Sequence, residues 1–585
     1  METSFHTPEV IHPESQITEW NGEAVYQVYP WSFAEDGRAQ GEGNLKGVTD
    51  KLDYLSDIGV GAIWISPFYP SPMKDGGYDI ENYTDVDKRF GTLQDFDELL
   101  ENAHEKDIKI IVDVVANHSS DQHPWFQESL SPESATSDWY IWKDPKQDED
   151  GNALYAENGT PLPPNNWGSV FSIGNRQAYE RGELELETTE DGEEYIPYKS
   201  AWIWNEQRQQ FYLADFRAEQ PNLNWANPEV RDAMKDVLRF WLDRGVDGFR
   251  MDVIDHIGTD PEFKDDSFTP DTNIDNPYDQ TGRENSIRHL PELVEYVDDL
   301  LSVTDEKKYQ DRNIRIVFES HADQSFNADN LDTRKPEIAG SFNFSSLYSE
   351  WKRSAKQQTI EDYLASLPQD AIPNFVNSNH DVDRLATRIG RAQARACGVL
   401  TLSLPGIIYI YQGEEGGFMN VDIPEDKIVD DAGFRDGERT PMMWDDTVNA
   451  GFSKADPESL WLPVDPNYKQ INLERQATEP NSHLNLYKGL INARKNSDIL
   501  RLGSYQPIPT NQEDVYAFAR THNGERTITA VNFSGSEQTV RLQAAGFSAA
   551  RTVMSASNIG DRGMLHDVEA ITIAPHDAHI LAPSA

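Results

Sequence analysis

Three carboxyl groups stand at the ends of short apolar runs that lie far apart in the sequence. Asp252 ends the run GFRMD, Glu319 follows RIVF, and Asp381 follows NFVNSNH. Paired carboxyl groups can serve as a nucleophile and as a general acid or base. Buried together, they need a cation or a polar substrate to offset their repulsion. Arg250, two residues before Asp252, can supply that cation. We therefore expect one site that contains all three carboxyl groups.

These runs belong to a set of β-rich segments that alternate with amphipathic helical patterns. One helical pattern has Asn227 as its N-cap and Gly245 after its last turn. Alternating strands and helices are typical of parallel βαβ units. Eight such strands predict an α/β fold, a (β/α)8 TIM barrel, whose chemistry lies at the C-terminal ends of the strands. The expected strands are 24–30, 61–67, 108–115, 247–254, 315–320, 341–344, 374–380 and 406–413.

Two regions depart from the barrel pattern. About 110 residues separate the third strand from the helix at Asn227, which predicts a subdomain inserted after that strand. Within it, 181–195 is a charged run that resembles a hairpin. From about residue 500, period-two runs such as RTITAVNF predict an antiparallel β domain. The expected division is barrel over 1–117 and 220–499, inserted subdomain over 118–219, and C-terminal β domain over 500–585.

The composition excludes several kinds of partner. The 585 residues include 51 basic and 101 acidic ones, which gives a formal net charge of −50. That charge repels nucleic acids and anionic membranes. The acidic residues are spread along the chain, which is typical of a solvated shell suited to molar salt, so we expect a halophilic protein. Cys397 is the single cysteine, so no disulfide can form within the chain.

The sequence carries no sign of export or membrane insertion. The first residues, METSFHTPEVIHPESQ, lack the basic and apolar regions of a secretory signal. No apolar run approaches the roughly 18 residues that a transmembrane helix needs. We expect a soluble, cytoplasmic protein.

Several motifs carry a resemblance to a known family. GFRMDVID (248–255), FES (318–320) and NSNHD (377–381) resemble the characteristic regions of the alpha-amylase family, glycoside hydrolase family thirteen. Its oligo-1,6-glucosidase, alpha-glucosidase and trehalose-synthase branch is the most similar part of the family. The similar segments run in family order from about residue 21 to about residue 500, and the further ones are VYQVYPWSF, PFYPSPMKDGGYDIENYTDV, DVVANHSSDQHPWF, QPNLNWANPEVR, YQGEE and RTPMMWDDTVNAGFS.

The resemblance implies a retaining glycosidase with three catalytic residues. Asp252 matches the nucleophile, Glu319 the general acid/base and Asp381 the transition-state stabiliser. Two carboxyl groups about 5–5.5 Å apart are what the retaining mechanism requires. We expect Asp252 to stay ionised, because Arg250 can donate hydrogen bonds to it. Glu319 follows an apolar run, and we expect it to hold its proton nearer neutral pH.

The resemblance also implies the residues that bind the first sugar. The tyrosine stacks on the ring, the two histidines bind hydroxyl groups, and the aspartate and arginine close the pocket at the non-reducing end; these residues are Asp75, Tyr78, His118, His380 and Arg439. A closed end implies exo-action. Arg435 competes with Arg439 for this place, because both lie in FRDGERTPMMW. The expected entrance residues are Phe171, Phe216 and Gln220. Core packing is the competing role for Phe216, and His123 and His321 are expected to be structural or rim residues.

The linkage preference rests on one side chain. In similar enzymes, valine after the nucleophile accompanies α-1,6 preference, and alanine or threonine accompanies α-1,4 preference. Here the residue is Val253. One methyl group discriminates by only about 1–3 kcal/mol, and the segment after Arg439 resembles maltases. We expect an exo-acting alpha-glucosidase that releases glucose from short α-1,6- or α-1,4-linked oligosaccharides.

No metal or other cofactor is expected. The branch usually carries a calcium loop after the first strand, where this sequence reads AEDGRAQGEGNLKG (34–47). Arg38, Gln40 and Asn44 stand where carboxylate ligands would be expected, and a hard cation needs several oxygen ligands with compensating charge.

Two alternative functions are open. The first is a trehalose synthase-like alpha-glucosyl transferase or isomerase that uses the same site. The second is an inactive barrel that serves as a scaffold; such relatives lack members of the catalytic three and carry a membrane span.

Overall fold

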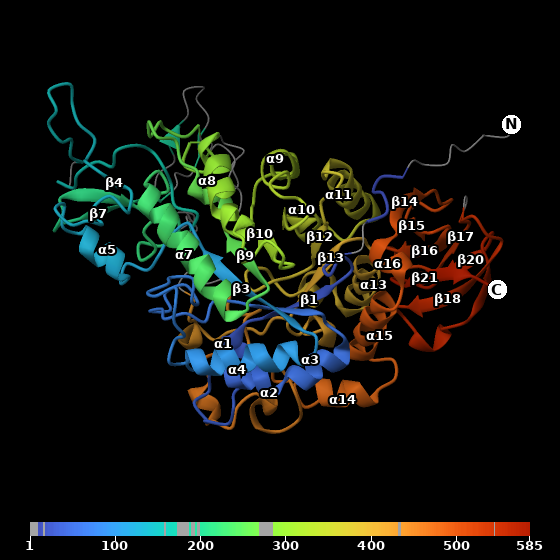
Figure 1. The fold of residues 1–585 in the computed structure, drawn as a ribbon. Coiled ribbons are helices and arrows are strands. Elements are labelled where there is room, and N and C mark those ends of the chain that lie inside the picture. The colour runs from blue at the N-terminus through green and yellow to red at the C-terminus, as the bar shows by residue number, and fades with distance from the viewer. Residues whose placement is uncertain are drawn as a thin grey trace.

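The computed structural model describes residues 10–584 apart from 16–17, 157–158, 172–186, 189–193, 196–198, 268–282, 284, 431–434 and 543–544. An eight-stranded parallel sheet lies at its centre, in the order β11-β10-β9-β3-β2-β1-β13-β12 (Figure 1). The strands are β1 (Ala24–Val28), β2 (Ala62–Ile65), β3 (Lys109–Val115), β9 (Gly248–Asp252), β10 (Arg315–Phe318), β11 (Ala339–Ser341), β12 (Asn374–Val376) and β13 (Ile407–Tyr411).

The sheet curls into a nearly closed barrel. Its two outer strands, β11 and β12, approach each other where Asn343 N donates to Asn374 O at 2.9 Å. Asn374 Nδ2 also donates to Ser341 O at 3.2 Å. These contacts confirm the predicted TIM-barrel class. One predicted strand is displaced: the chain leaves β11 at Ser341, because the Asn343 side chain caps helix α10 (Phe344–Tyr348).

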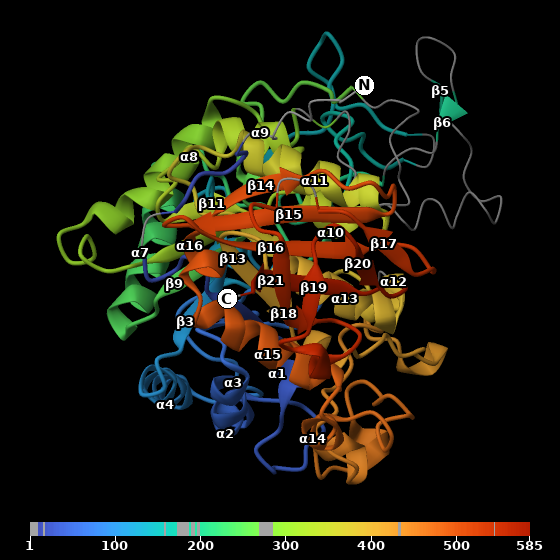
Figure 2. The ribbon, with the colours of Figure 1, turned by 90° about the vertical axis from the view of Figure 1, so that its right-hand side faces the viewer.

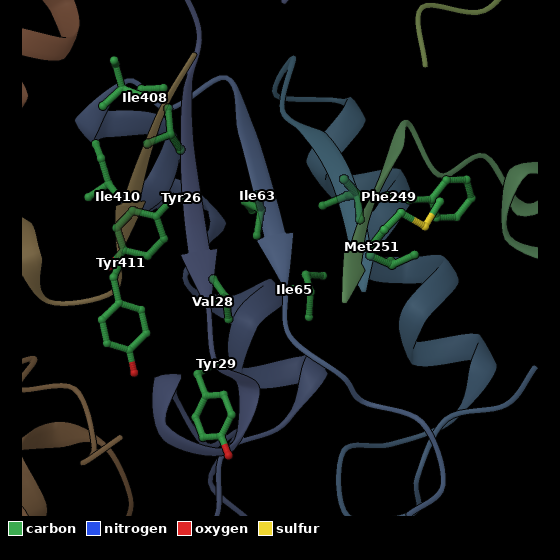
Figure 3. Close-up of a cluster of buried hydrophobic side chains, with 14 of the residues drawn as sticks. Tyr26, Val28, Tyr29, Ile63, Ile65, Phe249, Met251, Ile408, Ile410 and Tyr411 are labelled. Carbon is green, nitrogen blue, oxygen red and sulfur yellow. The ribbon is translucent and has the colours of Figure 1, made fainter. Parts of the chain in front are cut away.

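The alternation of side chains along each strand separates core from site. Ile63 and Ile65 on β2, like Phe249 and Met251 on β9, belong to one buried apolar cluster with residues of the surrounding helices (Figure 3). The residues between them face the barrel interior, where Trp64 packs in a second cluster. Because side chains alternate with period two, the same pattern directs Arg250 and Asp252 inward.

The helices of the barrel begin and end at residues that the sequence marks. Helix α7 (Pro228–Arg244) is capped by Asn227, whose side chain accepts from Glu229 N, and it ends at Gly245 with φ of 110°. Both ends were predicted. The other long helices around the barrel are α4 (Leu93–His104), α8 (Glu292–Leu301), α11 (Arg353–Ser366) and α13 (Arg391–Leu402).

The segment between β3 and α7 forms its own small structure. It contains α5 (Pro124–Ser129) and the antiparallel strands β4 (Trp142–Lys143), β8 (Gln210–Leu213) and β7 (Trp202–Asn205). In the predicted hairpin, β5 (Glu187–Thr188) pairs antiparallel with β6 (Glu194–Tyr195); the rest of 181–195 lies outside the described residues. The segment lies on the opposite side of the barrel from the C-terminal strands (Figure 1).

The C-terminal strands form antiparallel sheets, as predicted, and the larger one faces the viewer in Figure 2. These strands are β14 (Ser504–Ile508), β15 (Val515–His522), β16 (Glu525–Asn532), β17 (Gln538–Val540), β18 (Ala549–Ser555), β19 (Leu565–Asp567), β20 (Ile571–Ile573) and β21 (Ala578–Pro583). Helices α13, α15 (His483–Lys495) and α16 (Asp498–Leu502) lie between them and the barrel (Figure 1).

One buried arginine joins α15 to the barrel. Arg494 donates to Gly22 O at 2.9 Å, to Leu402 O at 2.9 Å, and to Leu404 O and Gly406 O at 2.6 Å each. It therefore holds together the turns that enter β1 and β13. Among the described residues, no helix combines the length and the apolar composition needed to cross a membrane.

Candidate active site

A cavity opens at the C-terminal ends of the barrel strands. It encloses about 450 Å³, including the space open to solvent at its mouth. The side chains come from strand ends, from the segment after β3 and from the loop after β13. The lining residues are Asp75, Tyr78, His118, Val170, Phe171, Phe216, Asp252, Val253, Glu319, His321, Asp381 and Arg435.

Arg250 is the centre of an acidic cluster at the floor of this cavity. Its Nη1 donates to Asp252 Oδ1 and to Asp113 Oδ1, both at 2.6 Å. Its Nη2 donates to Glu319 Oε2. All four side chains are buried. One guanidinium group thus serves three carboxyl groups on three neighbouring strands or strand ends.

The protonation pattern differs from the predicted one. Burial and the neighbouring carboxyl groups raise the pKa of Asp252 well above its usual range, against the pull of Arg250. Burial also raises the pKa of Glu319, but Arg250 and His321 outweigh this and lower it to about 2. The expectation of an ionised Asp252 and a protonated Glu319 is therefore wrong for the protein without substrate. The reason is that Arg250 reaches both groups and Glu319 also has His321 beside it, at 3.4 Å.

Asp381, the third carboxyl group, has cations on two sides. Arg439 Nη2 donates to Asp381 Oδ1 at 2.6 Å and Arg435 Nη1 donates to the same oxygen at 3.1 Å. Burial would raise the pKa of Asp381, but His380, Arg439 and Arg435 outweigh it and hold the pKa well below its usual range. Asp381 therefore stays ionised.

An ionic network closes the cavity beyond Asp381. Arg435 Nη2 donates to Asp75 Oδ1 at 2.5 Å, and Arg435 Nε donates to Asp430 Oδ2 at 3.0 Å. Arg217, from the segment after β3, donates to Asp430 Oδ1 at 2.6 Å. Burial is again outweighed, here by Arg435 and Arg217, so that the pKa of Asp75 is lowered. The network joins the segment after β3 to the loop after β13.

Tyr78 and His118 complete the polar wall, and His380 supports it from behind Tyr78. His380 is stacked between Tyr29 and Tyr78, with ring centroids 5.7 and 5.0 Å away. Burial lowers the pKa of His380 to about 3 and that of His118 to about 4. Both rings are therefore neutral at physiological pH and can exchange hydrogen bonds with hydroxyl groups. Gln220 is buried behind them and lies within 3.0 Å of Asp75 Oδ2 and His118 Nε2.

Aromatic rings form the opposite wall. Phe171 and Phe216 meet edge to face, with centroids 5.7 Å apart. The ring of Phe216 also lies 5.3 Å from His118. Phe216 is partly exposed and lines the cavity. It therefore both packs against neighbouring rings and forms part of the cavity wall.

Comparisons with known proteins agree with this geometry. Residues 27–503 match the family description "Alpha amylase, catalytic domain". The chain belongs to the alpha-amylase family. It is 38% identical to Maltase 1 of Drosophila virilis, over 90% of this chain and 80% of the relative. It is 34% identical to an oligo-1,6-glucosidase of Parageobacillus thermoglucosidasius, over 89% of this chain and 92% of the relative.

A solved structure extends the comparison to the whole fold. The alpha-glucosyl transfer enzyme XgtA is 32% identical, with a TM-score of 0.82 over 97% of this chain and 100% of that chain. By this kinship the protein is a glycoside hydrolase of the alpha-glucosidase and oligo-1,6-glucosidase type. The scaffold alternative has no support from these relatives.

The backbone is strained directly after Asp252. Val253, directly after Asp252, has φ of 35°, in the left-handed region that β-branched residues rarely adopt. Its N–H donates to Glu319 Oε2 at 3.2 Å, and its side chain lines the cavity. Strain of this kind persists where the surroundings fix the backbone, commonly at functional sites. It brings the strand end of Asp252 against Glu319.

Most of the predicted site residues line the cavity, and a few support it from behind. Four of them, Gln220, Arg250, His380 and Arg439, contact the lining residues without lining the cavity themselves. Arg435, not Arg439, stands beside Asp75 at the closed end. His123 caps α5 through its side chain, as a structural residue does.

Sequence reasoning missed His321, Arg217 and Asp430. His321 was expected to be a structural or rim residue, yet it lines the cavity beside Glu319. Its position two residues after Glu319 is the signal that could have indicated this. Arg217 and Asp430 carried no such signal, because both lie in loops that are far apart in the sequence and come into contact only in the folded chain.

The calcium loop of the branch does not fit a cation in this chain. Arg38 Nε donates to Asp36 Oδ1 at 3.0 Å, and Asn44 Nδ2 donates to the same oxygen at 3.2 Å. These donors satisfy the carboxylate that a hard cation would need. Within the part of the chain that the structure describes, no group of three or more His, Cys, Asp or Glu residues is arranged to hold a metal ion.

Proposed function

We propose that the protein is a retaining, exo-acting alpha-glucosidase that releases glucose from the non-reducing end of short oligosaccharides. The observation that carries the proposal is that Asp252, Glu319 and Asp381 face one cavity whose far end is closed by Arg435 and Asp75. A pocket closed in this way accepts one terminal sugar and excludes the middle of a chain. In this proposal 1–117 and 220–499 form the catalytic barrel, 118–219 supplies the entrance, and 500–585 packs against the barrel.

The proposed reaction has two steps. Asp252 attacks the anomeric carbon while Glu319 gives its proton to the departing glycosidic oxygen, so that a glucosyl ester forms as the C–O bond breaks. Water then attacks the ester, and Glu319 takes the proton that the water loses. Asp381 binds sugar hydroxyl groups, and these bonds strengthen as the ring becomes cationic. The buried acidic cluster around Arg250 favours retention of a proton, which must lie on Glu319 when substrate is bound.

The proposed sugar contacts are lining residues and His380, whose ring stacks against Tyr78. Tyr78 stacks on the ring, His118 and His380 bind hydroxyl groups, and Arg435 with Asp75 closes the non-reducing end. Phe171 and Phe216 border the entrance. Val253 lies next to the attacking carboxylate, where its bulk disfavours an α-1,4-linked leaving sugar. We therefore propose activity on α-1,6 links together with α-1,4 links, in proportions that one methyl group shifts only modestly.

A transferase or isomerase is the second candidate. Its support is the similarity to the alpha-glucosyl transfer enzyme XgtA over nearly the whole chain. Such an enzyme forms the same ester but passes glucose to a sugar instead of water. Incubation with maltose separates the two functions, since trehalose or longer sugars with little free glucose would replace the hydrolase proposal.

The test is a product analysis with isomaltose, maltose, sucrose and trehalose in molar KCl. We expect glucose to appear first as the α-anomer, observed by NMR. Asp252→Asn should lower kcat by about 10⁴-fold or more, because it removes the nucleophile. Asp97→Asn, a half-exposed site on α4, is the matched control and should keep full activity. Comparable rates in Asp252→Asn, or glucose first released as the β-anomer, would contradict the proposal.

A further inference from the structure

Asp113 is a buried carboxyl group that the proposed reaction does not use. It lies near the end of β3, beside Arg250 of β9. Its Oδ1 accepts from Arg250 Nη1 at 2.6 Å, while its Oδ2 accepts from Trp64 Nε1 at 2.9 Å and Tyr78 OH at 3.1 Å. Asp113 is fully buried and does not line the cavity. It therefore reaches the substrate only through Arg250 and Tyr78.

The charges around Arg250 do not balance. With Asp113, Asp252 and Glu319 all ionised, the cluster would carry three negative charges against one positive charge. A buried group of this kind relieves the excess by keeping a proton. Without Asp113, two carboxylates would share one guanidinium group, and the excess would be a single charge. The number of carboxyl groups thus sets how tightly the cluster holds its proton.

We propose that Asp113 is a positioning residue that keeps the acid/base proton on the catalytic cluster. Its ionised carboxylate occupies one side of Arg250 and prevents that guanidinium from fully neutralising Asp252 and Glu319. The proposal rests on the proposed glycosidase function. Burial raises the pKa of Asp113 to about 6, against the pull of Arg250, so Asp113 carries its charge at neutral pH.

The other titratable groups near this proton come from several elements. Tyr69 OH donates to Asp113 O, and Tyr78 donates to the carboxylate. On the far side of Glu319 stand His321 and the carboxylate of Asp381. The further groups whose charge or ring faces the cluster are Tyr348 and His380. A substitution at Asp113 leaves these side chains in the protein but alters the hydrogen bonds that Tyr78 and Trp64 donate to its carboxylate. A variant that keeps the charge is therefore compared with one that removes it.

The consequence for catalysis has a definite sign. A neighbouring negative charge favours the neutral form of Glu319, and its removal lowers the pKa at which the proton is lost. In the first step that proton moves from Glu319 to the leaving oxygen, while Asp113 neither gains nor loses one. Loss of the Asp113 charge should therefore move the alkaline limb of the pH profile to lower pH.

The test compares Asp113→Asn with the wild type on two substrates over a range of pH. Maltose needs a protonated leaving group, whereas 4-nitrophenyl α-glucoside does not. In Asp113→Asn we expect the alkaline limb of the kcat/KM profile for maltose to shift to lower pH by about one unit or more. At the pH where wild type is half active, a shift of one pH unit should lower maltose turnover about fivefold further than nitrophenyl glucoside turnover. Asp247→Asn, directly before β9, is the matched control.

Asp113→Glu retains the charge and keeps the inference testable if Asp113→Asn does not fold. Its alkaline limb should stay within about 0.3 pH units of wild type, whatever its absolute rate. An unmoved limb in Asp113→Asn, equal losses on both substrates, or a shifted limb in Asp113→Glu would overturn the inference. Failure of the wild type to hydrolyse either substrate would instead overturn the proposed function.

Discussion

Two ionic networks border the same cavity, each with some members behind its wall, and they differ in their ratio of carboxyl to guanidinium groups. Around Arg250, three carboxyl groups share one cation. At the closed end, among the described residues, Asp75, Asp381 and Asp430 meet three guanidinium groups, those of Arg217, Arg435 and Arg439. Most members of both networks are buried, and only Arg217 and Asp381 of the closed-end network are partly exposed. Burial alone therefore does not explain the difference between the networks.

The difference decides where a proton can reside. Burial raises the pKa of Asp252 and of Asp113, and one guanidinium group is not enough to reverse this. At the closed end the arginines outweigh burial and lower the pKa of Asp75 and of Asp381. The acid-rich network retains a proton, whereas the balanced network stays ionised. In the proposed reaction the first network supplies the transferable proton and the second binds sugar hydroxyl groups.

The strongest way to break this comparison is to remove the single cation of the acid-rich network. Arg250→Gln should lower kcat/KM by about 10³-fold or more, because the remaining carboxyl groups then hold their protons more tightly and Asp252 cannot reach the ionised form that its attack needs. The measurement is steady-state kinetics on nitrophenyl glucoside. Arg475→Gln, which removes an exposed partner of Glu479, serves as the control; a loss below tenfold in Arg250→Gln would count against the scheme.

Removing one of three cations should act on binding and stability. Arg435→Gln leaves Asp75 and Asp430 with less compensation, and breaking a buried pair costs about 3–5 kcal/mol of folding free energy. We expect KM to rise about tenfold or more with a smaller change in kcat. Urea unfolding gives the stability change, and kinetics on isomaltose gives the split between KM and kcat. A variant with unchanged KM and unchanged stability would show that the network does not shape the pocket.

Added salt should act on the surface charges and not on the buried charges. Its effect should be the smallest of these three predictions. At molar KCl the Debye length falls to about 3 Å, which screens repulsion among exposed acids but not among buried ones. With a net charge of −50, the protein should gain about 2 °C or more in Tm between 0.1 and 2 M KCl. Calorimetry measures the gain, while the pH profile of kcat should stay in place. A Tm that does not rise with KCl would contradict the proposed adaptation to salt.

The sequence predicted much of the barrel because each strand is a short apolar run followed by a helix. It also placed Asp252, Glu319 and Asp381 at strand ends, which barrel geometry brings together. It could not choose between Arg435 and Arg439, because both lie in one loop and only the folded path shows which one meets Asp75. The prediction of the protonation states of Asp252 and Glu319 was wrong for a similar reason. Arg250 is close to Asp252 in the sequence, but its Nη2 donates to Glu319, which follows the neighbouring strand β10.

Arg494 has a consequence for how the chain is made. Strand β1 lies between β2 and β13, so one edge of it waits for residues 407–411. Arg494 donates hydrogen bonds to the turns before β1 and β13, and it is synthesised after β13. Synthesis proceeds from the N-terminus at about 5–20 residues per second. Strand β1 is therefore made many seconds before Arg494 can donate to the turn that precedes it. A nascent chain that ends just before residue 494 therefore has all eight barrel strands but lacks the side chain that joins the turns before β1 and β13.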